Sequence, residues 1–175
     1  MPSINYLSYQ LFVDLDGVLV DFDNAVFRLT GKMPDELLPN QMWPVLARTR
    51  RFYENLNWMR DGRLLWDSLI RFNPVILTGL PMGKWAEPQK RNWCERELGP
   101  DVPVIAGMSR RKGELAHTWM AEQGMDGRVP VLIDDRLKMK ASWEDLGGIF
   151  ILHLNAADSL SALANLGFPI EDASH

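Results

Sequence analysis

The chain has 175 residues, of which 46% are hydrophobic and 24% charged, a composition typical of a globular domain with a full apolar core. The formal net charge of -4 argues against general affinity for nucleic-acid polymers. One cysteine, Cys94, excludes an internal disulfide and a cysteine-built metal site. No segment resembles a signal peptide or reaches transmembrane length, so we expect a cytoplasmic protein that does not contact a membrane.

Short apolar segments alternate along the chain with segments of helical periodicity. The predicted strands are 11–14, 75–79, 102–106, 129–135 and 149–154. The predicted helices are 21–29, 61–71, 88–98, 113–123, 137–146 and 159–166, the last of them capped by Asp158. Strands that are apolar on both faces and alternate with helices predict an α/β fold with a doubly wound parallel sheet.

The sequence changes character between Lys32 and Asn73. This stretch is rich in proline and in large aromatic residues, a pattern that indicates short helices and turns rather than further strands. We interpret residues 22–71 as a small helical cap inserted after the first strand. Residues 1–21 and 72–175 would then form the core of the fold.

The first predicted strand ends in two aspartates, Asp14 and Asp16, followed by Gly17. Side chains two positions apart on an extended strand point the same way, and ligands of open parallel sheets bind beyond the carboxyl ends of the strands. Two carboxylates held together are costly unless a cation lies between them or one takes a proton. The alternative is a hairpin turn, which Asp-Gly also favours.

Polar side chains also follow the other predicted strands. Right-handed crossovers place the carboxyl ends of parallel strands at one edge of a sheet, so these side chains can converge although they are distant in sequence. Each alone has a structural explanation: a helix cap, a solvated surface charge or the start of a turn. Together they favour phosphoryl transfer at a hard cation, because carboxylates bind Mg²⁺ and can attack phosphorus. The residues are Thr78, Gly79, Lys112, Asp134 and Asp135.

This ordered set resembles the four motifs of the haloacid dehalogenase (HAD) superfamily. Further strings are similar to the 5′(3′)-deoxyribonucleotidases within it, and the resemblance extends from about Leu11 to His153. The second motif departs from the usual Thr-Ser-Pro, and the shorter insertion leaves base and sugar preference open. The strings that carry the resemblance are Asp14-Leu-Asp-Gly-Val-Leu-Val-Asp-Phe, Thr78-Gly-Leu-Pro, Trp93 with Leu98-Gly-Pro-Asp, Arg110-Arg-Lys and Leu132-Ile-Asp-Asp-Arg with Ser142-Trp-Glu.

The resemblance implies a role for each matched residue. Asp14 would be the nucleophile and a metal ligand, and Asp16 the general acid and base, with its backbone carbonyl also on the metal. Mg²⁺ is the implied cofactor. Asp135 is our first choice for the remaining protein ligand, with Asp134 beside it. The implied phosphate-binding residues are Thr78, Gly79 and Lys112.

Aromatic residues of the insertion are candidates to contact a nucleobase. We expect Trp43 and Phe52 to bind substrate, because aromatic faces stack on bases. The alternative is that they pack the cap against itself. Arg110, like Arg136, could contact phosphate or base, or be a surface charge. We expect Met42, Tyr53 and Leu80 to lie near this substrate pocket. We assign no chemistry to Cys94, His117 or His153.

These observations predict a Mg²⁺-dependent phosphatase that hydrolyses deoxynucleoside or nucleoside monophosphates through an aspartyl-phosphate intermediate. Control of nucleotide pools is the role that the resemblance implies. One alternative is a phosphatase of the same fold acting on another small phosphomonoester, such as a sugar phosphate. Another is a non-catalytic nucleotide- or metal-binding module. Whether the protein forms a homodimer, through the cap or a sheet edge, is left open by the sequence.

Overall fold

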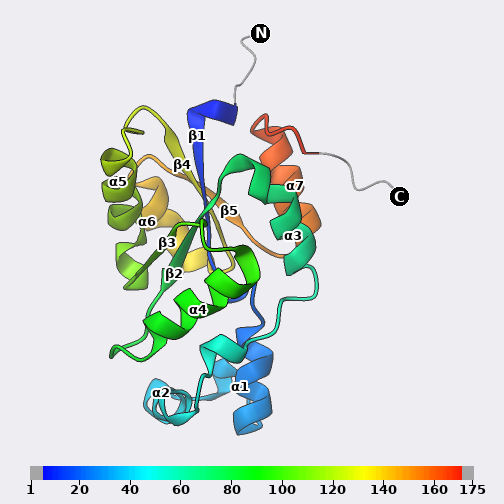
Figure 1. The fold of residues 1–175 in the computed structure, drawn as a ribbon, viewed down its shortest axis with the longest axis vertical. Coiled ribbons are helices and arrows are strands. Elements are labelled where there is room, and N and C mark those ends of the chain that lie inside the picture. The colour runs from blue at the N-terminus through cyan, green and yellow to red at the C-terminus, as the bar shows by residue number, and fades with distance from the viewer. Residues whose placement is uncertain (1–5, 171–175) are drawn as a thin grey trace.

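A computed structural model describes residues 6–170 of the chain. Five strands form one parallel sheet in the order β3-β2-β1-β4-β5, with helices on both faces (Figure 1). The strands are β1 (Tyr9–Val13), β2 (Val75–Gly79), β3 (Val104–Gly107), β4 (Val129–Asp134) and β5 (Ile149–Leu152). The α-helices are α1 (Phe22–Thr30), α2 (Pro39–Arg48), α3 (Gly62–Leu69), α4 (Ala86–Leu98), α5 (Lys112–Glu122), α6 (Lys140–Glu144) and α7 (Ala156–Asn165).

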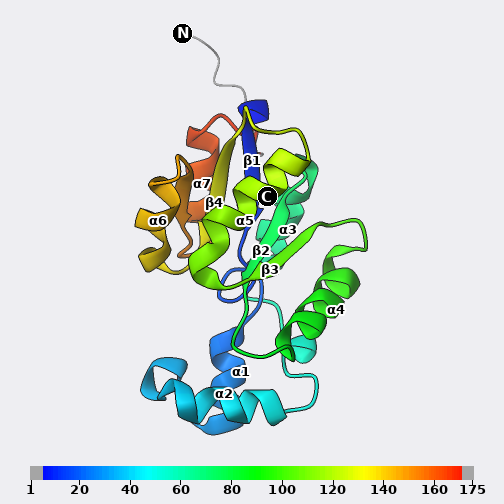
Figure 2. The ribbon, with the colours of Figure 1, turned by 90° about the vertical axis from the view of Figure 1, so that its left-hand side faces the viewer.

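Two apolar cores cover the two faces of the sheet, because alternate side chains of each strand point to opposite sides. Leu11 and Val13 of β1 belong to the core under α3, α4 and α7. Phe12 lies between them in sequence and belongs to the core under α5 and α6. The two layers of helices are visible on either side of the strands in Figures 1 and 2. The predicted α/β fold with a parallel, doubly wound sheet is confirmed.

The strand order reverses beside β1, since the chain first adds β2 and β3 on one side and then places β4 on the other. Both neighbours of β1 are parallel to it, which excludes the hairpin that Asp-Gly could have formed. A reversal of strand order opens a crevice outside the carboxyl ends of the two strands concerned. The ends of β1 and β4 carry Asp14, Asp134 and Asp135, so the fold places these residues at that crevice.

Several predicted element boundaries need correction. The third strand begins at Val104 rather than at residue 102. The stretch 137–146, expected to be mostly helical, is so: a 3-10 turn leads into the short α6. The predicted cap of the last helix was wrong: α7 begins at Ala156, and Asn155 is its N-cap. The Asn155 side-chain oxygen accepts a 2.8 Å hydrogen bond from the Asp158 backbone N–H. Asp158 therefore lies inside the first turn.

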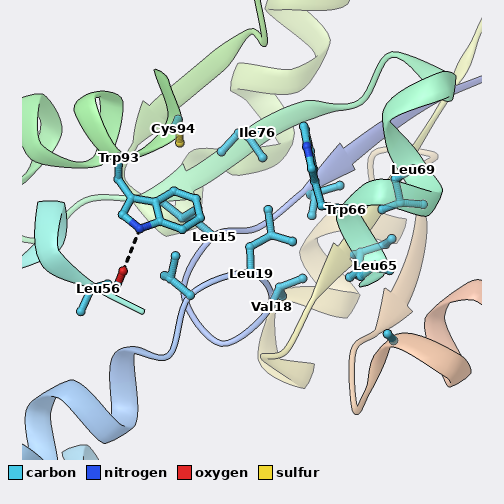
Figure 3. Packing of buried hydrophobic residues seen from close by; sticks show 14 of the residues in the cluster. Leu15, Val18, Leu19, Leu56, Leu65, Trp66, Leu69, Ile76, Trp93 and Cys94 are labelled. Carbon is cyan, nitrogen blue, oxygen red and sulfur yellow. Dashed lines mark hydrogen bonds between the residues drawn. The ribbon is translucent and has the colours of Figure 1, made fainter. Parts of the chain in front are cut away.

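The segment between β1 and β2 divides into a part beyond the sheet and a part packed against it. Helices α1 and α2 extend beyond the end of the sheet, whereas α3 returns to pack against α7 (Figures 1 and 2). Figure 3 shows Leu15 and Leu19 of the loop after β1 lying between Trp93 of α4 and Leu65 of α3. The Trp93 indole N–H donates to the Leu56 carbonyl at 2.9 Å, which ties α4 to the inserted segment.

Within residues 6–170, no helix combines the length and apolar character needed to cross a membrane.

Candidate functional site

The loop after β1 is shaped by one glycine. Asp14 extends the sheet by donating its backbone N–H to the Ile133 carbonyl at 2.9 Å. Gly17 follows with φ of 77°, in the left-handed region, and its N–H donates to Val20 O at 2.9 Å. A Cβ at Gly17 would overlap the Asp135 carboxylate. Glycine is required here both for the backbone conformation and for the approach of β1 to the end of β4.

Lys112 lies between two buried carboxylates. It is the first residue of α5, and its ammonium is 2.8 Å from Asp14 Oδ1 and 2.7 Å from Asp134 Oδ2. All three side chains are almost completely buried. A buried charge is tolerated only when it is paired, so the arrangement fixes the Asp14 carboxylate at the end of β1.

The two carboxylates on Lys112 differ in their proton affinity. Burial raises the pKa of Asp14, and the attraction of Lys112 is offset by repulsion from Asp134 and Asp16. Burial would also raise the pKa of Asp134, but its ion pair and hydrogen bond with Lys112 outweigh burial and lower that pKa. Asp134 Oδ1 additionally accepts the Arg136 backbone N–H at 2.9 Å. Asp134 therefore holds its charge more firmly than Asp14 does.

Three carboxylates form a cluster that fits a divalent metal ion. Asp14, Asp134 and Asp135 can each offer one oxygen, and these oxygens lie within 4.8 Å of one another. Partial burial and repulsion from Asp14 and Asp134 raise the pKa of Asp135 to about 7. Both oxygens of Asp134 already accept hydrogen bonds, whereas Asp135 is exposed at the cavity. An all-carboxylate donor set suits Mg²⁺, and a cation there would relieve the repulsion.

Asp16 is held by a different lysine. Lys90 of α4 is fully buried, and its ammonium donates to Asp16 Oδ2 at 2.6 Å, to Thr78 Oγ1 at 3.0 Å and to the Gly79 carbonyl at 2.9 Å. Asp16 therefore has a different cation partner from Asp14 and Asp134. Sequence reasoning did not identify Lys90, although it shares a helix face with the buried residues Ala86, Trp93 and Cys94.

A cavity of about 440 Å³ opens between the carboxyl ends of the strands and the inserted segment. This volume lies in the range of small-molecule sites, which run from about 300 to 1,000 Å³. Carboxylates and backbone of the strand ends form one wall, and side chains of the insertion form another. The lining residues are Asp14, Asp16, Gly17, Phe22, Asp23, Pro34, Trp43, Tyr53, Gly79, Leu80, Pro81, Ser109, Asp135, Arg136 and Lys138.

The predicted substrate-binding residues have different positions. Trp43 lines the cavity, as do Tyr53, Leu80 and Arg136. Phe52 is buried and lines a separate cavity of about 190 Å³ with Asn24, Arg28 and others, while Met42 is buried in the core. Arg110 is exposed on the loop before α5 and does not line the larger cavity.

Thr78 and Lys112, predicted to bind phosphate, are fully buried beneath that cavity. Gly79 does line it, and a Cβ there would overlap the Ser109 hydroxyl. The same hydroxyl accepts a 3.1 Å hydrogen bond from the Arg136 guanidinium. Gly79 thus allows two loops to approach each other at the mouth of the site.

Three aromatic rings of the insertion, those of Phe22, Trp43 and Tyr53, line the cavity and pack against neighbouring rings. Phe22 stacks on Tyr53 with 6.0 Å between centroids, and Tyr53 also stacks on Trp85, the residue before α4, at 5.4 Å. Phe22 also contacts Trp43 at 6.1 Å. Sequence reasoning assigned no role in the site to Phe22, Ser109 or Lys138. The rings pack with one another and also present apolar surface to a ligand.

Three residues to which no chemistry was assigned lie outside this cavity. Cys94 is buried, and burial raises the pKa of its thiol to about 12. His117 is on the exposed side of α5, with Nε2 3.0 Å from the Leu146 carbonyl. His153 is buried after β5, with Nδ1 2.9 Å from the Ser159 hydroxyl.

Comparison with known proteins gives no family assignment. No family model matches the chain, and no curated protein sequence matches it at a significant level. The chemistry of the site has to be argued from its own side chains.

Proposed function

We propose that this protein is a Mg²⁺-dependent phosphatase of the HAD superfamily that hydrolyses nucleoside monophosphates, in the manner of the 5′(3′)-deoxyribonucleotidases. The observation that carries the proposal is the different setting of two carboxylates at one cavity. Asp14 pairs with Lys112 within the acidic cluster, whereas Asp16 pairs with Lys90. The buried Oδ1 of Asp16 has no hydrogen-bond partner among residues 6–170. Groups with such unequal surroundings suit the roles of nucleophile and proton carrier.

In the first step, an Asp14 oxygen attacks the phosphorus atom and the bond from phosphorus to the leaving oxygen breaks. The leaving oxygen takes a proton from Asp16, so the departing group is an alcohol. In the second step, a water molecule attacks the aspartyl phosphate while Asp16 takes its proton. The bond between phosphorus and Asp14 breaks, which releases inorganic phosphate and restores both carboxyl groups.

Asp14, Asp134 and Asp135 would hold Mg²⁺, whose charge when bound neutralises phosphate oxygens and favours the ionised form of Asp14. Lys112 keeps the Asp14 carboxylate fixed at the end of β1. The Gly79 backbone, at the cavity wall, allows a phosphate group to approach closely. Arg136 and Lys138 line the same cavity and add positive charge for an anionic ligand.

The cavity wall supports a nucleotide as substrate. Phe22, Trp43 and Tyr53 line the side formed by the insertion, opposite the strand ends. Aromatic faces bind the flat surface of a base with little dependence on its identity. A phosphate at Asp14 with a base against these rings would span the cavity. A sugar phosphate would leave the rings without a flat partner.

The test is phosphate release from deoxy- and ribonucleoside 5′- and 3′-monophosphates, several sugar phosphates and an aryl phosphate, with Mg²⁺ and with chelator. We expect metal-dependent release from nucleotides and a loss of at least about 10³-fold in Asp14→Asn, which keeps the shape but removes the nucleophile. Asp67→Asn, at an exposed position of α3, is the matched control and should retain activity.

Each other outcome of this panel has a definite meaning. Release from sugar phosphates alone would keep the chemistry and reject the nucleotide. Appreciable turnover by Asp14→Asn would reject Asp14 as the nucleophile. Nucleotide binding without release from any ester would support a non-catalytic binding module.

A further inference from the structure

We infer that Lys90 is a positioning residue that fixes the orientation of the Asp16 carboxylate beside the cavity. The inference rests on the proposed function, since it assigns a task to Lys90 within the same reaction. It starts from a side chain that is fully buried yet charged, on a helix of which, among residues 6–170, no residue lines the cavity.

All the hydrogen-bonding capacity of Lys90 is used inside the protein. A lysine ammonium has three hydrogens and no acceptor. Lys90 has three oxygen partners, Asp16 Oδ2 at 2.6 Å, Thr78 Oγ1 at 3.0 Å and Gly79 O at 2.9 Å. A phosphate contact would therefore require Lys90 to give up one of these bonds. Its role is to orient protein groups rather than to bind substrate.

The hydrogen bond from Lys90 gives the two oxygens of Asp16 different surroundings. Oδ2 accepts a hydrogen bond from the Lys90 ammonium at 2.6 Å, which ties the carboxylate to α4. Oδ1 is buried and has no hydrogen-bond partner in the described chain. A buried acceptor without a partner is costly and normally finds one. Oδ1 thus has no protein partner among residues 6–170, and the bond from Lys90 to Oδ2 is what keeps the carboxylate beside the cavity that Asp16 lines.

The same ammonium orients Thr78. Because Lys90 can only donate, the Thr78 hydroxyl oxygen must accept from it, which leaves the hydroxyl hydrogen to point elsewhere. One lysine thereby sets the direction of two groups at the ends of different strands.

Contacts from both α4 and the insertion keep Lys90 in place. Three residues further along the helix, the Trp93 indole is anchored to the Leu56 carbonyl at 2.9 Å. The Tyr53 ring lies beneath the ammonium, with Nζ 4.4 Å from the ring centroid. This cation–π contact joins the positioning residue to the aromatic wall of the cavity.

Esters with different leaving groups separate this task from other roles. A nucleoside leaves as an alkoxide unless an acid protonates it, whereas p-nitrophenolate leaves without protonation. The constant kcat/KM reports only the steps up to departure of the leaving group. Loss of the Asp16 orientation should therefore lower kcat/KM for a nucleotide far more than for p-nitrophenyl phosphate.

The experiment compares both substrates in Lys90→Met and Lys90→Gln, with Arg91→Gln as the control that removes an exposed cation one residue further along α4. We expect the ratio of kcat/KM for p-nitrophenyl phosphate to that for the nucleotide to rise at least about tenfold in both Lys90 variants. The ratio is independent of the fraction of folded enzyme. The Arg91 variant should keep the wild-type ratio.

A double-mutant cycle checks that Lys90 acts through Asp16. In an Asp16→Asn background, adding Lys90→Gln should leave the substrate ratio unchanged, since no proton carrier remains to be oriented. An equal loss for both substrates in the Lys90 single variants, or no loss for either, would overturn the inference while leaving the phosphatase intact. A wild-type enzyme that releases phosphate from neither ester would instead reject the proposed function, and the inference with it.

Discussion

Two glycines of similar backbone conformation differ in what surrounds them. Gly17 has φ of 77° and Gly31 has φ of 74°. A Cβ at Gly17 would overlap Asp135, whereas a Cβ at Gly31 would meet nothing within 4 Å. A substitution at Gly31 therefore reports backbone strain alone, and the same substitution at Gly17 reports strain together with the displaced carboxylate.

We expect Gly31→Ala to lower the free energy of unfolding by about 1–2 kcal/mol, the usual cost of an L residue in the left-handed region. Gly17→Ala should cost clearly more and should also weaken Mg²⁺ binding, because the Asp135 carboxylate has to move. Urea unfolding and calorimetric Mg²⁺ titration measure the two effects. Equal costs at both positions would mean that Asp135 adjusts freely.

Asp135 offers a test of the metal site that does not depend on activity. Its carboxylate is repelled by Asp14 and Asp134, which contributes to its raised pKa. At pH 8 and without metal, Asp135→Asn should be more stable than the wild type, because the substitution removes that repulsion. Added Mg²⁺ should stabilise the wild type by about 1.4 kcal/mol at ten times its dissociation constant, and the variant much less.

Thermal unfolding with Mg²⁺ and with chelator measures both effects on Asp135. Asp67→Asn again serves as the control and should keep the full response to Mg²⁺. An undiminished response in Asp135→Asn would remove Asp135 from the metal site.

At the scale of elements, the junction between β5 and α7 contains a buried imidazole. Burial lowers the pKa of His153, although Asp61 and Asp158 act in the opposite direction. Because the folded-state pKa is lower than the unfolded value of about 6.5, the stability present above pH 6.5 is lost as the pH falls through the folded pKa.

We expect His153→Phe to lose this acid-side decline in stability. At pH 8 the variant should be less stable by about 1 kcal/mol, since the hydrogen bond with Ser159 is lost. Unfolding free energies measured between pH 4 and 8 give both effects. His117→Gln, which removes an exposed imidazole, should retain the decline; a His153→Phe curve parallel to the wild type would contradict the prediction.

Element positions were predictable where local signals decide them. The strand predicted over 75–79 and the helix predicted over 21–29 agree with the structure, because an apolar run and a helical apolar spacing are local features. The start of α7 was not, since Asn155 and Asp158 are both good caps and the course of the chain after β5 decides between them. Lys90 was missed because a charge in a polar helix normally indicates a surface position.

At the scale of the whole molecule, the parallel sheet explains why much of the site could be anticipated. Parallel strands leave their carboxyl ends at one edge, so Asp14, Thr78 and Asp134 had to lie near one another. Which lysine pairs with which of these side chains was not predictable, because it depends on which helix presents a lysine to each of them. The lining of the cavity by Phe22 and Trp43 likewise depends on the packing of an insertion without a regular hydrophobic period.

The position of β1 in the middle of the sheet has a consequence for how the chain folds. β1 is made early, yet its partner on one side, β4, begins only at Val129. Until that segment has been synthesised, Leu11 and Phe12 lie on an open strand edge, and contacts so distant in sequence form slowly. The acidic cluster is completed by the same pairing, so no shorter product ending before β4 can acquire the metal site.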